Sequence, residues 1–346
     1  MQFELVENPE TVALSNVPPS NWRDIYLVKN LPARLLSWIK DKKMPVDKWL
    51  KEREKKTVTG SIANVYLAQG DVYAYPRTYY EAPADLAPRY HLPCNDTIME
   101  KSNLKSSSFT GNMFTRHGNK YEPMAIQYYA KSLVIPARHR LIVLPGDECF
   151  DLIDHPSFPW ISASPDGIAV LVDEDNSFKE WYLLEAKNVW GTIYKTKQDD
   201  KLKYFAQLQV LMEILEIPKA HLIQCCIPYD NIKDANAKTM YRKYETDFNQ
   251  LESGKHERYF SFAVSEFVRN PLWFDTVFLP CASDAHRRIQ ELKAGIETSD
   301  LRTLEVDAKL PKTSEPFPFK SLVWRCANVS SATGTHSQAV RARFGK

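Results

Sequence analysis

The chain has 346 residues, of which 44% are hydrophobic and 12% are aromatic, so it can bury a substantial core and is not intrinsically disordered. Its 45 basic and 43 acidic residues nearly cancel to a net charge of +2, so any attraction to nucleic acid must come from local patches. The six cysteines lie scattered, without the C-x-x-C or His spacing of a zinc site, and we interpret them as reduced thiols of an intracellular protein.

The N-terminal part of the chain is expected to be an arm followed by a helix. Residues 1–20 are polar and contain a Pro-Pro pair, and they begin without a basic and apolar signal segment. Apolar positions from Trp22 to Ile39 allow a helix that is interrupted near Pro32. Apolar runs such as LIVL at 141–144 are too short to span a bilayer, so we expect no membrane association and a cytoplasmic or nuclear location.

A basic stretch follows, from Lys40 to Lys56. It has eight Lys or Arg residues against four Asp or Glu, with Trp49 inside it. Taken alone, such a stretch is more typical of a solvated helix face than of a binding surface. The next segment, VTGSIANVYLAQG (58–70), predicts a turn and an apolar helix with Ser61 as the N-cap. Residues 71–109 show too little periodicity for an assignment and are expected to be irregular.

Helices and one strand are predicted around the central part of the chain. Residues 118–131 favour a helix with Glu122 near its start and with Pro123 tolerated in the first turn. Further on, Tyr204 to Leu215 predicts a helix, and AHLIQCCIPYD (220–230) predicts a strand. The region 265–298 favours a helix toward its end, and the Pro-rich sequence after it indicates loose C-terminal structure.

A β-hairpin is predicted between these helices. The β-rich runs WISASPDGIAVLV (160–172) and WYLLEAK (181–187) are separated by the polar loop DEDNSFKE. Residues two apart in a strand point to the same face, so Glu185 and Lys187 project together. Asp166, at the end of the paired strand, comes within reach of that face if the register is right, and the glycine after it allows a tight turn.

Two carboxylates and an ammonium group would then converge. A hard divalent cation such as Mg²⁺ takes oxygen ligands, polarises a phosphodiester and lowers the pKa of a bound water, while a lysine can orient that water. The hairpin therefore predicts a site for phosphodiester hydrolysis. Each feature also has a plain alternative: Asp-Gly is a common turn pair, Glu-x-Lys is ordinary on an exposed strand, and Glu122 is a favourable charge at a helix start. Gln207 alone indicates nothing.

The order and spacing of five short blocks point to one family. The blocks are W-x-x-x-R…T-G-S (Trp49, Arg53, Thr59, Gly60, Ser61), G-x-x-x-E-P-x-A (Gly118, Glu122, Pro123, Ala125), SPDG (164–167), LLEAKN (183–188) and Y-x-x-Q-x-Q (Tyr204, Gln207, Gln209). Over about residues 45–230 the chain resembles the phage lambda exonuclease, or YqaJ-like viral recombinase (alkaline exonuclease), branch of the PD-(D/E)xK nuclease superfamily. No single block is specific, but five in this order are.

The resemblance implies a fold and a metal site. The fold would be α/β (α+β), with a PD-(D/E)xK restriction-endonuclease-like core in which a mixed central β-sheet is flanked by helices. Asp166, Glu185 and the backbone carbonyl of Ala186 would bind one or two Mg²⁺ ions, with Mn²⁺ as a substitute. Glu122 would complete a second metal position, and Lys187 would be the catalytic lysine.

The resemblance also implies contacts with DNA. Arg53 and Ser61 would form a pocket for the 5′-phosphate of a DNA end, but they lie one residue further apart than in the family pattern, so Lys55 or Lys56 could share this contact. Gln207 and Tyr204 would line the site from the helix after the catalytic strand. Arg116, beside His117, is either an extra phosphate contact or, as we favour, part of an ordinary loop pair.

The implied function is Mg²⁺-dependent digestion of double-stranded DNA from a 5′ end, which leaves 3′ single-stranded tails for recombination or repair. The expected partners are duplex DNA ends and a single-strand annealing protein, and the oligomeric state, homo-oligomer included, stays open. The alternatives are a structure-specific endonuclease of the same fold, a non-catalytic DNA-end-binding scaffold and, less favoured, an enzyme acting on small phosphates. The scattered cysteines argue against relatives with an iron–sulfur cluster.

We divide the chain into an N-terminal arm and helix (1–45), a nuclease domain (46–300) and a partly loose C-terminal extension (301–346).

Overall fold

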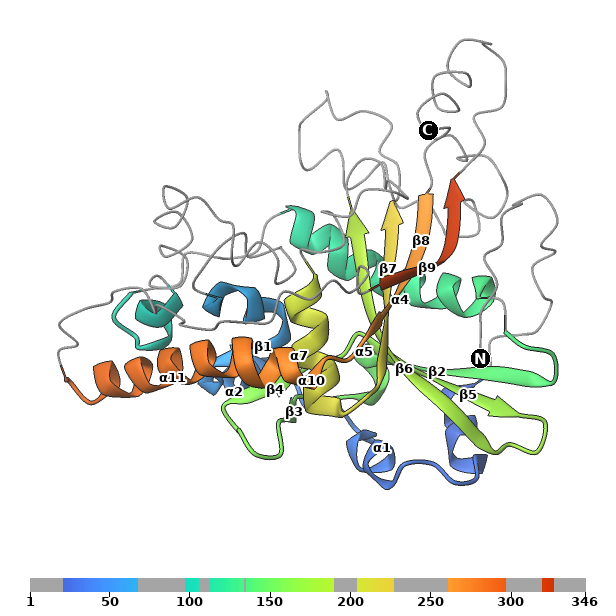
Figure 1. Cartoon of the computed structure of the whole chain (residues 1–346), viewed down its shortest axis with the longest axis horizontal. Helices are drawn as coiled ribbons and strands as arrows, with labels where there is room; N and C mark the ends of the chain where they lie inside the picture. The colour runs from blue at the N-terminus through green and yellow to red at the C-terminus, as the bar shows by residue number, and fades with distance from the viewer. Residues whose placement is uncertain are drawn as a thin grey trace, which may run out of the picture.

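The structure is a computed structural model of the chain, and it describes residues 21–67, 97–105, 113–133, 135–189, 204–226, 261–296 and 319–326. Its centre is a six-stranded sheet in the order β2-β5-β6-β7-β8-β9 (Figure 1). The strands are β2 (His139–Pro145), β5 (Gly167–Asp173), β6 (Phe178–Val189), β7 (Lys219–Cys226), β8 (Ser261–Val268) and β9 (Phe319–Cys326).

The sheet is mixed. β6 and β7 are parallel, whereas every other neighbouring pair is antiparallel. A parallel pair needs a crossover connection, and helix α7 (Phe205–Leu215) lies in the chain between β6 and β7. The main elements from α4 (Met113–Ser132) to β7 are thus a helix, three antiparallel strands, a crossover helix and a parallel strand. The predicted fold class, α+β with a mixed central sheet between helices, is confirmed.

Two apolar clusters cover the two faces of the sheet. On one face α4 packs its Tyr129 against Tyr182 and Phe262, and in Figure 1 this helix passes behind the strands. On the other face α7 buries residues such as Leu208 with Leu183 of β6. Because side chains alternate along a strand, Glu185 and Lys187 lie on the same face of β6 as Leu183, toward α7.

Helix α7 also packs against segments from the N-terminal half of the chain, besides η4 (Phe274–Phe278) further along it. A small sheet, β1 (Val58–Thr59), β4 (Ile161–Ala163) and β3 (Ile153–Asp154), lies beside α7 together with the 3-10 helix η2 (Gly60–Tyr66). A Cβ atom on Gly60 would come within 2.8 Å of the Leu211 side chain, so η2 packs tightly on α7. Helix α2 (Val46–Lys55) precedes β1 and has no buried residue.

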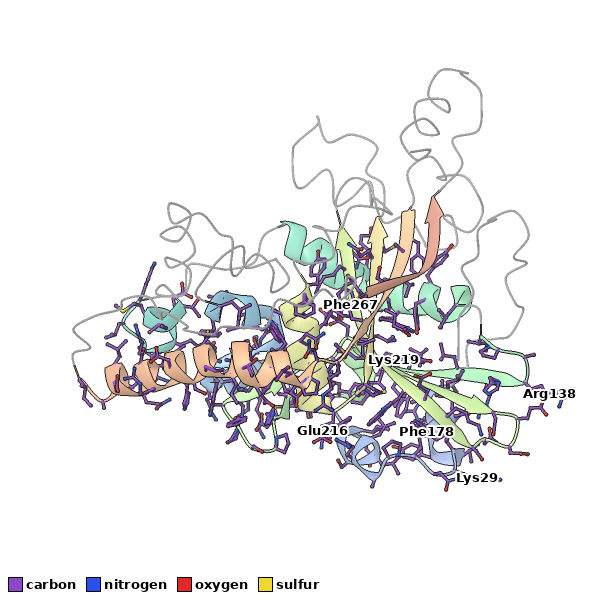
Figure 2. All side chains as sticks on the ribbon, in the orientation of Figure 1. Lys29, Arg138, Phe178, Glu216, Lys219 and Phe267 are labelled. Atoms are coloured by element: carbon purple, nitrogen blue, oxygen red, sulfur yellow. The ribbon has the colours of Figure 1, made fainter. Side chains whose placement is uncertain are left out.

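The remaining elements close the ends of the molecule. They are η1 (Trp22–Leu27), α1 (Ala33–Trp38), α5 (Gly146–Cys149), α10 (Pro271–Trp273), η4 (Phe274–Phe278) and α11 (Leu279–Lys293). The residues after η1 hold the loop of the β5–β6 hairpin: Phe178 donates its backbone N–H to the Lys29 carbonyl over 2.9 Å. Figure 2 shows these two residues at the same end of the sheet.

Most elements predicted from the sequence are present. The β5–β6 hairpin, α7, β7 and α11 are confirmed. The predicted interruption near Pro32 of the helical stretch Trp22–Ile39 is confirmed: η1 ends at Leu27, and α1 begins at Ala33 with Pro32 as its N-cap residue. None of the helices among the described residues is long and apolar enough to cross a membrane.

Two predictions about helix starts were wrong. Helix α4 begins at Met113, so Glu122 and Pro123 lie within it rather than in its first turn. Ser61 lies inside η2 and accepts a hydrogen bond from an arginine instead of capping a helix. In both cases the helical segment begins before the residue that the local pattern marks as its start.

Two other local predictions also need correction. Gly167, the glycine of the Asp-Gly pair, starts β5 without a positive φ, so it does not form a tight turn. A Cβ atom at this position would lie 3.1 Å from the Leu144 carbonyl oxygen, so the glycine instead lets two strands approach closely. Residues 97–101, within the segment expected to be irregular, are helical.

The C-terminal part of the sheet was not predicted. Residues 261–268 form β8, where the sequence pointed only to a later helix, and residues 319–326 form β9, where loose structure was expected. Both strands are stabilised by pairing with partners that are distant in the sequence, so they carry little local signal. The predicted arm (1–20), most of the irregular region (71–96 and 106–109) and the tail after 326 lie outside the described residues.

Candidate active site

The β5–β6 hairpin brings Asp166 to the catalytic strand. Gly167 pairs with Leu184, so Asp166 lies at the end of β5 beside the next residues of β6. Its Oδ2 accepts a hydrogen bond from the backbone N–H of Ala186 at 2.8 Å. The register on which the predicted convergence depended is therefore the observed one.

Glu185 is the centre of the site. Its Oε1 accepts hydrogen bonds from Lys187 Nζ, in the same strand, and from Gln207 Nε2, in α7. The residue is only 1% exposed, and its Oε2 is buried without a hydrogen-bond partner among the residues that the structure describes. A buried carboxylate oxygen without a partner is costly, and a bound cation would remove that cost.

Burial and the neighbouring charges shift the pKa values of the acids and of the lysine in this site. Burial, together with the negative charge of Glu185, raises the pKa of Asp166 well above its usual range. The same two causes raise the pKa of Glu122 to about 7. Burial alone would lower the pKa of Lys187, but the charges of Glu185 and Asp166 outweigh it and raise that pKa. We call Glu122, Asp166 and Glu185 the acidic cluster.

Glu122 reaches this cluster from α4, on the other side of the sheet. The end of β6 is tied to that helix, because Asn188 Nδ2 donates a hydrogen bond to the Gly118 carbonyl at 3.0 Å. Gly118 is one helical turn before Glu122, so the tie holds the acid near the strand. The structure thus brings Asp166, Glu185 and Lys187 together, and Glu122 interacts with their charges from α4.

The donor set fits a hard divalent cation. Asp166, Glu185 and the carbonyl of Ala186 offer oxygen atoms only, which suits Mg²⁺ or Mn²⁺ better than zinc. The unpartnered Oε2 of Glu185 and the raised pKa of Asp166 are both what a missing positive charge would produce. Within the part of the chain that the structure describes, no three Asp, Glu, His or Cys side chains already form a metal-ligand group.

A second group of residues lies on α2 and η2. Arg53 Nη2 donates a hydrogen bond to Ser61 Oγ at 2.6 Å, and its guanidinium lies 5.1 Å from the centre of the Trp49 ring. Thr59 Oγ1 is 3.4 Å from Ser61 Oγ. The W-x-x-x-R and T-G-S blocks, predicted to act together, are therefore in contact.

A further cation, Lys101, belongs to the same group and was missed by the sequence. Its Nζ donates to the carbonyl of Glu54 at 3.4 Å, and burial followed by the charge of Arg53 lowers its pKa. No carboxylate among the described residues forms an ion pair with Arg53 or Lys101. We call Arg53, Ser61 and Lys101 the basic cluster. Two partly buried cations without a carboxylate suit an anion such as a phosphate.

Comparison with known protein families gives a match over most of these elements. Residues 48–225, just over half of the chain, match the YqaJ-like viral recombinase domain. The chain belongs to this family. The matched residues run from α2 to the end of β7 and contain both clusters, so the family membership predicted from the five blocks is confirmed.

Three solved structures are similar to this YqaJ-like recombinase chain. They are an alkaline exonuclease (LHK-Exo) from Laribacter hongkongensis, the same enzyme in complex with dAMP, and a phage related exonuclease from Haemophilus somnus 129PT. The first two are 16% identical, cover 72% of this chain and 94% of their own, and have TM-scores of 0.40 and 0.38. The third is 14% identical, covers 69% and 96%, and has a TM-score of 0.44. No curated protein matches the chain.

The other predicted DNA contacts are placed less centrally in this recombinase domain. Lys55 pairs with Glu52 at 2.7 Å, and Lys56 pairs with Asp154 at 2.7 Å, so both cations are already compensated. Tyr204 lies at the start of α7, with its ring centre 5.7 Å from Lys187 Nζ. Arg116 and His117 lie in α4, so the loop pair that was favoured for them is wrong, and the side chain of Arg116 lies outside the described residues.

Sequence reasoning also missed the support beneath Asp166. Gly146 donates its backbone N–H to the Asp166 carbonyl at 2.7 Å, and a Cβ atom there would lie 2.1 Å from the Pro165 carbonyl oxygen. Only glycine fits so close an approach of two backbones. The glycine at the end of an apolar run was the available signal, but nothing local shows which backbone it faces.

Proposed function

We propose that this protein is a Mg²⁺-dependent DNA exonuclease, active also with Mn²⁺, that hydrolyses duplex DNA from the 5′ end. The observation that supports this proposal most directly is the environment of the Glu185 carboxylate. This buried carboxylate lies next to Asp166, with one oxygen held by Lys187 and Gln207 and the other without a partner in the described part of the chain. Membership of the viral recombinase family supports a role of this arrangement in DNA cleavage.

The metal would be held by Asp166, Glu185 and the carbonyl of Ala186, with Glu122 near enough to serve a second ion. Once bound, it would supply Lewis acidity toward a phosphodiester and would lower the pKa of a bound water. Two hydrogen bonds hold the carboxylates in place: the Ala186 N–H donates to Asp166, and the Gln207 side chain donates to Glu185. These contacts fix the two carboxylates before any ion arrives, which limits reorganisation during the reaction.

Lys187 supplies a positive charge next to Oε1 of Glu185. Its ammonium is within hydrogen-bonding reach of Glu185 and close to the Tyr204 ring, and the surrounding acids keep it protonated. A protonated lysine can orient the attacking water and stabilise the charge that develops on the phosphate oxygens. It therefore acts as an electrostatic group in this proposal, not as a base.

The basic cluster would select the DNA end. A 5′-terminal phosphate carries more negative charge than an internal phosphodiester. Arg53 and Lys101 offer two positive charges with no carboxylate partner among the described residues, and the Ser61 hydroxyl adds a hydrogen-bonding group. Recognition of the terminal phosphate would make cleavage start at 5′ ends and leave 3′ single-stranded tails. An annealing protein that binds such tails, and a homo-oligomer that retains the DNA, complete the proposal.

The test is digestion of linear duplex DNA labelled at the 5′ or the 3′ end, beside a closed circular duplex, with Mg²⁺ or EDTA. Release of 5′ label that requires the metal, with the circle intact, is the expected result. Nicking of the circle would replace end-directed cleavage by endonuclease activity of the same fold. Absence of cleavage with Mg²⁺ and with Mn²⁺ would replace the enzyme by a DNA-end-binding scaffold.

A further inference from the structure

A short segment that precedes the family-matched residues contacts residues 146–151, which follow β2 and include α5. We call residues 146–151 the active-site turn. The contacting segment, Ile39–Met44, precedes residue 48, where the match begins, and we call it the N-terminal brace. Ile39 forms an antiparallel bridge with Phe150, and the Lys40 N–H donates to the Cys149 carbonyl at 3.0 Å.

The far end of the brace is fixed by a carboxylate. The Met44 N–H lies 3.0 Å from Oδ1 and 3.3 Å from Oδ2 of Asp151, and Asp151 is only 9% exposed. A hydrogen bond from a backbone amide to a buried carboxylate is stronger than one between neutral groups. The brace is thus tied at both ends to the turn that follows β2.

Between these ties Lys43 reaches the turn itself. Its Nζ donates to the Gly146 carbonyl at 2.9 Å. The N–H of Gly146 in turn donates to the Asp166 carbonyl, and Asp166 Oδ2 accepts from the Ala186 N–H. Three successive hydrogen bonds therefore run from the Lys43 ammonium to the two residues that would carry metal ligands.

The contact at Gly146 is tight. The space where a Cβ atom would stand is filled by the Pro165 and Asp166 carbonyl oxygens, at 2.1 Å and 2.7 Å. Backbone packed this closely transmits a shift of Gly146 directly to Asp166. Lys43, by holding the outer carbonyl of Gly146, sets the position of that residue.

We infer that Lys43 is a positioning residue for Asp166, and that the N-terminal brace is part of the catalytic apparatus although it lies outside the matched family segment. The inference rests on the proposed function for the role of Asp166. Lys43 acts through Gly146, so its loss changes where a metal ligand stands and leaves the DNA contacts of the basic cluster intact. A misplaced ligand lowers metal affinity and the rate of chemistry.

A direct contact between Lys43 and DNA is the rival explanation, because this lysine belongs to the basic stretch 40–56. The side chain is partly buried, and its Nζ already donates to a carbonyl. The two explanations give different kinetics. A phosphate contact raises the KM for DNA, whereas a positioning residue lowers kcat and weakens metal binding at an unchanged KM.

The experiment compares Lys43→Met, Lys43→Arg and Lys179→Met in the full chain. Lys43→Met keeps the length of the side chain and removes its donor, and Lys43→Arg keeps a donor and the charge. Lys179→Met is the matched control: this lysine pairs with Asp173 at 2.7 Å at the opposite end of the same hairpin. Mn²⁺ affinity is measured by calorimetry without DNA, kcat and KM on 5′-phosphorylated duplex, and the unfolding midpoint by heating.

We expect Lys43→Met to weaken Mn²⁺ binding about tenfold and to lower kcat about tenfold, with KM unchanged. Its unfolding midpoint should stay within about 3 °C of the wild type, and Lys43→Arg and Lys179→Met should keep most of the Mn²⁺ affinity. Asp151→Ala, which frees the end of the brace, should weaken Mn²⁺ binding in the same direction and provides a second variant.

Three results would overturn the inference. One is unchanged Mn²⁺ affinity with a raised KM in Lys43→Met, which would make Lys43 a DNA contact. Another is equal loss of affinity in Lys43→Met and Lys43→Arg with a lowered unfolding midpoint, which would make the role merely structural. The third is no effect in Lys43→Met. If the wild type binds Mn²⁺ but cuts no DNA, the proposed function fails while the brace is still tested by metal affinity.

Discussion

The acidic cluster and the basic cluster are built on different supports. Glu185 and Asp166 stand on two central, paired strands, and the register of the sheet fixes their separation. Arg53 stands on α2, a helix without a single buried residue, and contacts Ser61 on a short 3-10 helix. One cluster is therefore set by the core of the protein, and the other by a surface helix.

In both clusters buried groups of like charge interact, negative in the acidic cluster and positive in the basic cluster. In the first, burial and then the charge of Glu185 raise the pKa of Glu122 and of Asp166. In the second, burial and then the charge of Arg53 lower the pKa of Lys101. An ion of the other charge would relieve the repulsion in each: a divalent cation in the acidic cluster and a phosphate in the basic cluster. In the proposed function, the chemistry needs a fixed geometry and would take place on the sheet, whereas end selection needs charge and would take place on a helix.

The largest effect is expected from removing the acids or the lysine of the sheet. Asp166→Ala, Glu185→Ala and Lys187→Ala should each lower the cleavage rate by about 10³-fold or more, because each removes a group that acts on the transition state. DNA binding, measured by fluorescence anisotropy in Ca²⁺, should remain within a few-fold of the wild type. A variant that cuts at near wild-type rate would show that the acidic cluster is not the reaction centre.

A smaller and different effect is expected from the basic cluster. Arg53→Ala should reduce the preference for a 5′-phosphorylated over a 5′-hydroxyl end by about 30-fold, since a hydrogen bond to a charged group contributes about 1.5–3 kcal/mol. The rate on a 5′-hydroxyl end should change little. Competition between the two ends in one reaction measures the ratio.

Arg287→Ala is a suitable control for that measurement. This arginine is exposed on α11 and pairs with Asp284 and Glu291, so the variant removes a surface cation that is already paired with carboxylates. An equal fall in the rates on both ends in Arg53→Ala would count against end selection and would indicate a general role of Arg53 in binding.

The sequence predicted the parts of the site that depend on local patterns. Asp166, Glu185 and Lys187 follow from strand alternation and one hairpin loop, whereas Gln207 was placed near them only by the family resemblance. Arg53 and Ser61, eight residues apart, were paired by motif and meet as expected. In each case the contact is made within one element or between two neighbouring ones.

Contacts between distant segments could not be predicted. The Lys43–Gly146 hydrogen bond joins residues 103 positions apart, and Lys101 lies in a region without periodicity. The strands β8 and β9 exist because the edge of the sheet offers them pairing partners, and the position of Pro123 inside α4 depends on a helix that begins earlier than its apolar pattern. Tertiary packing decides such features, and no local signal encodes them.

The acidic cluster should also affect how the free energy of unfolding depends on pH. In metal-free protein the folded pKa of Glu122, about 7, lies above its value in the unfolded chain, so the folded state binds the proton more tightly. Stability from this group is therefore greatest below about pH 4.5 and is lost as the pH rises to about 7. Glu122→Gln removes this dependence.

We expect Glu122→Gln to be more stable than the wild type at pH 8 in EDTA, by an amount on the order of 1–2 kcal/mol, and to lose that advantage at pH 4.5. Urea unfolding at the two pH values measures the difference. Saturating Mn²⁺ should reduce the advantage at pH 8, because the ion supplies the missing positive charge. A constant difference at both pH values would mean that Glu122 is not held among the other acids.

The smallest effects are expected from two glycine variants, one in α4, which carries Glu122, and one in η2, which carries Ser61. Gly118 lies inside α4, and a Cβ atom there would meet none of the described atoms within 4 Å, so Gly118→Ala should stabilise the protein by about 0.5–1 kcal/mol through helix propensity. Gly60 is different, because its Cβ would press on Leu211 at 2.8 Å, and Gly60→Ala should cost about 1 kcal/mol. Because Gly60 starts η2, that variant should also disturb Ser61 and weaken the 5′-phosphate preference, whereas Gly118→Ala should leave it unchanged. Equal end preference in the two variants, measured by the same competition, would show that the basic cluster does not depend on how η2 packs against α7.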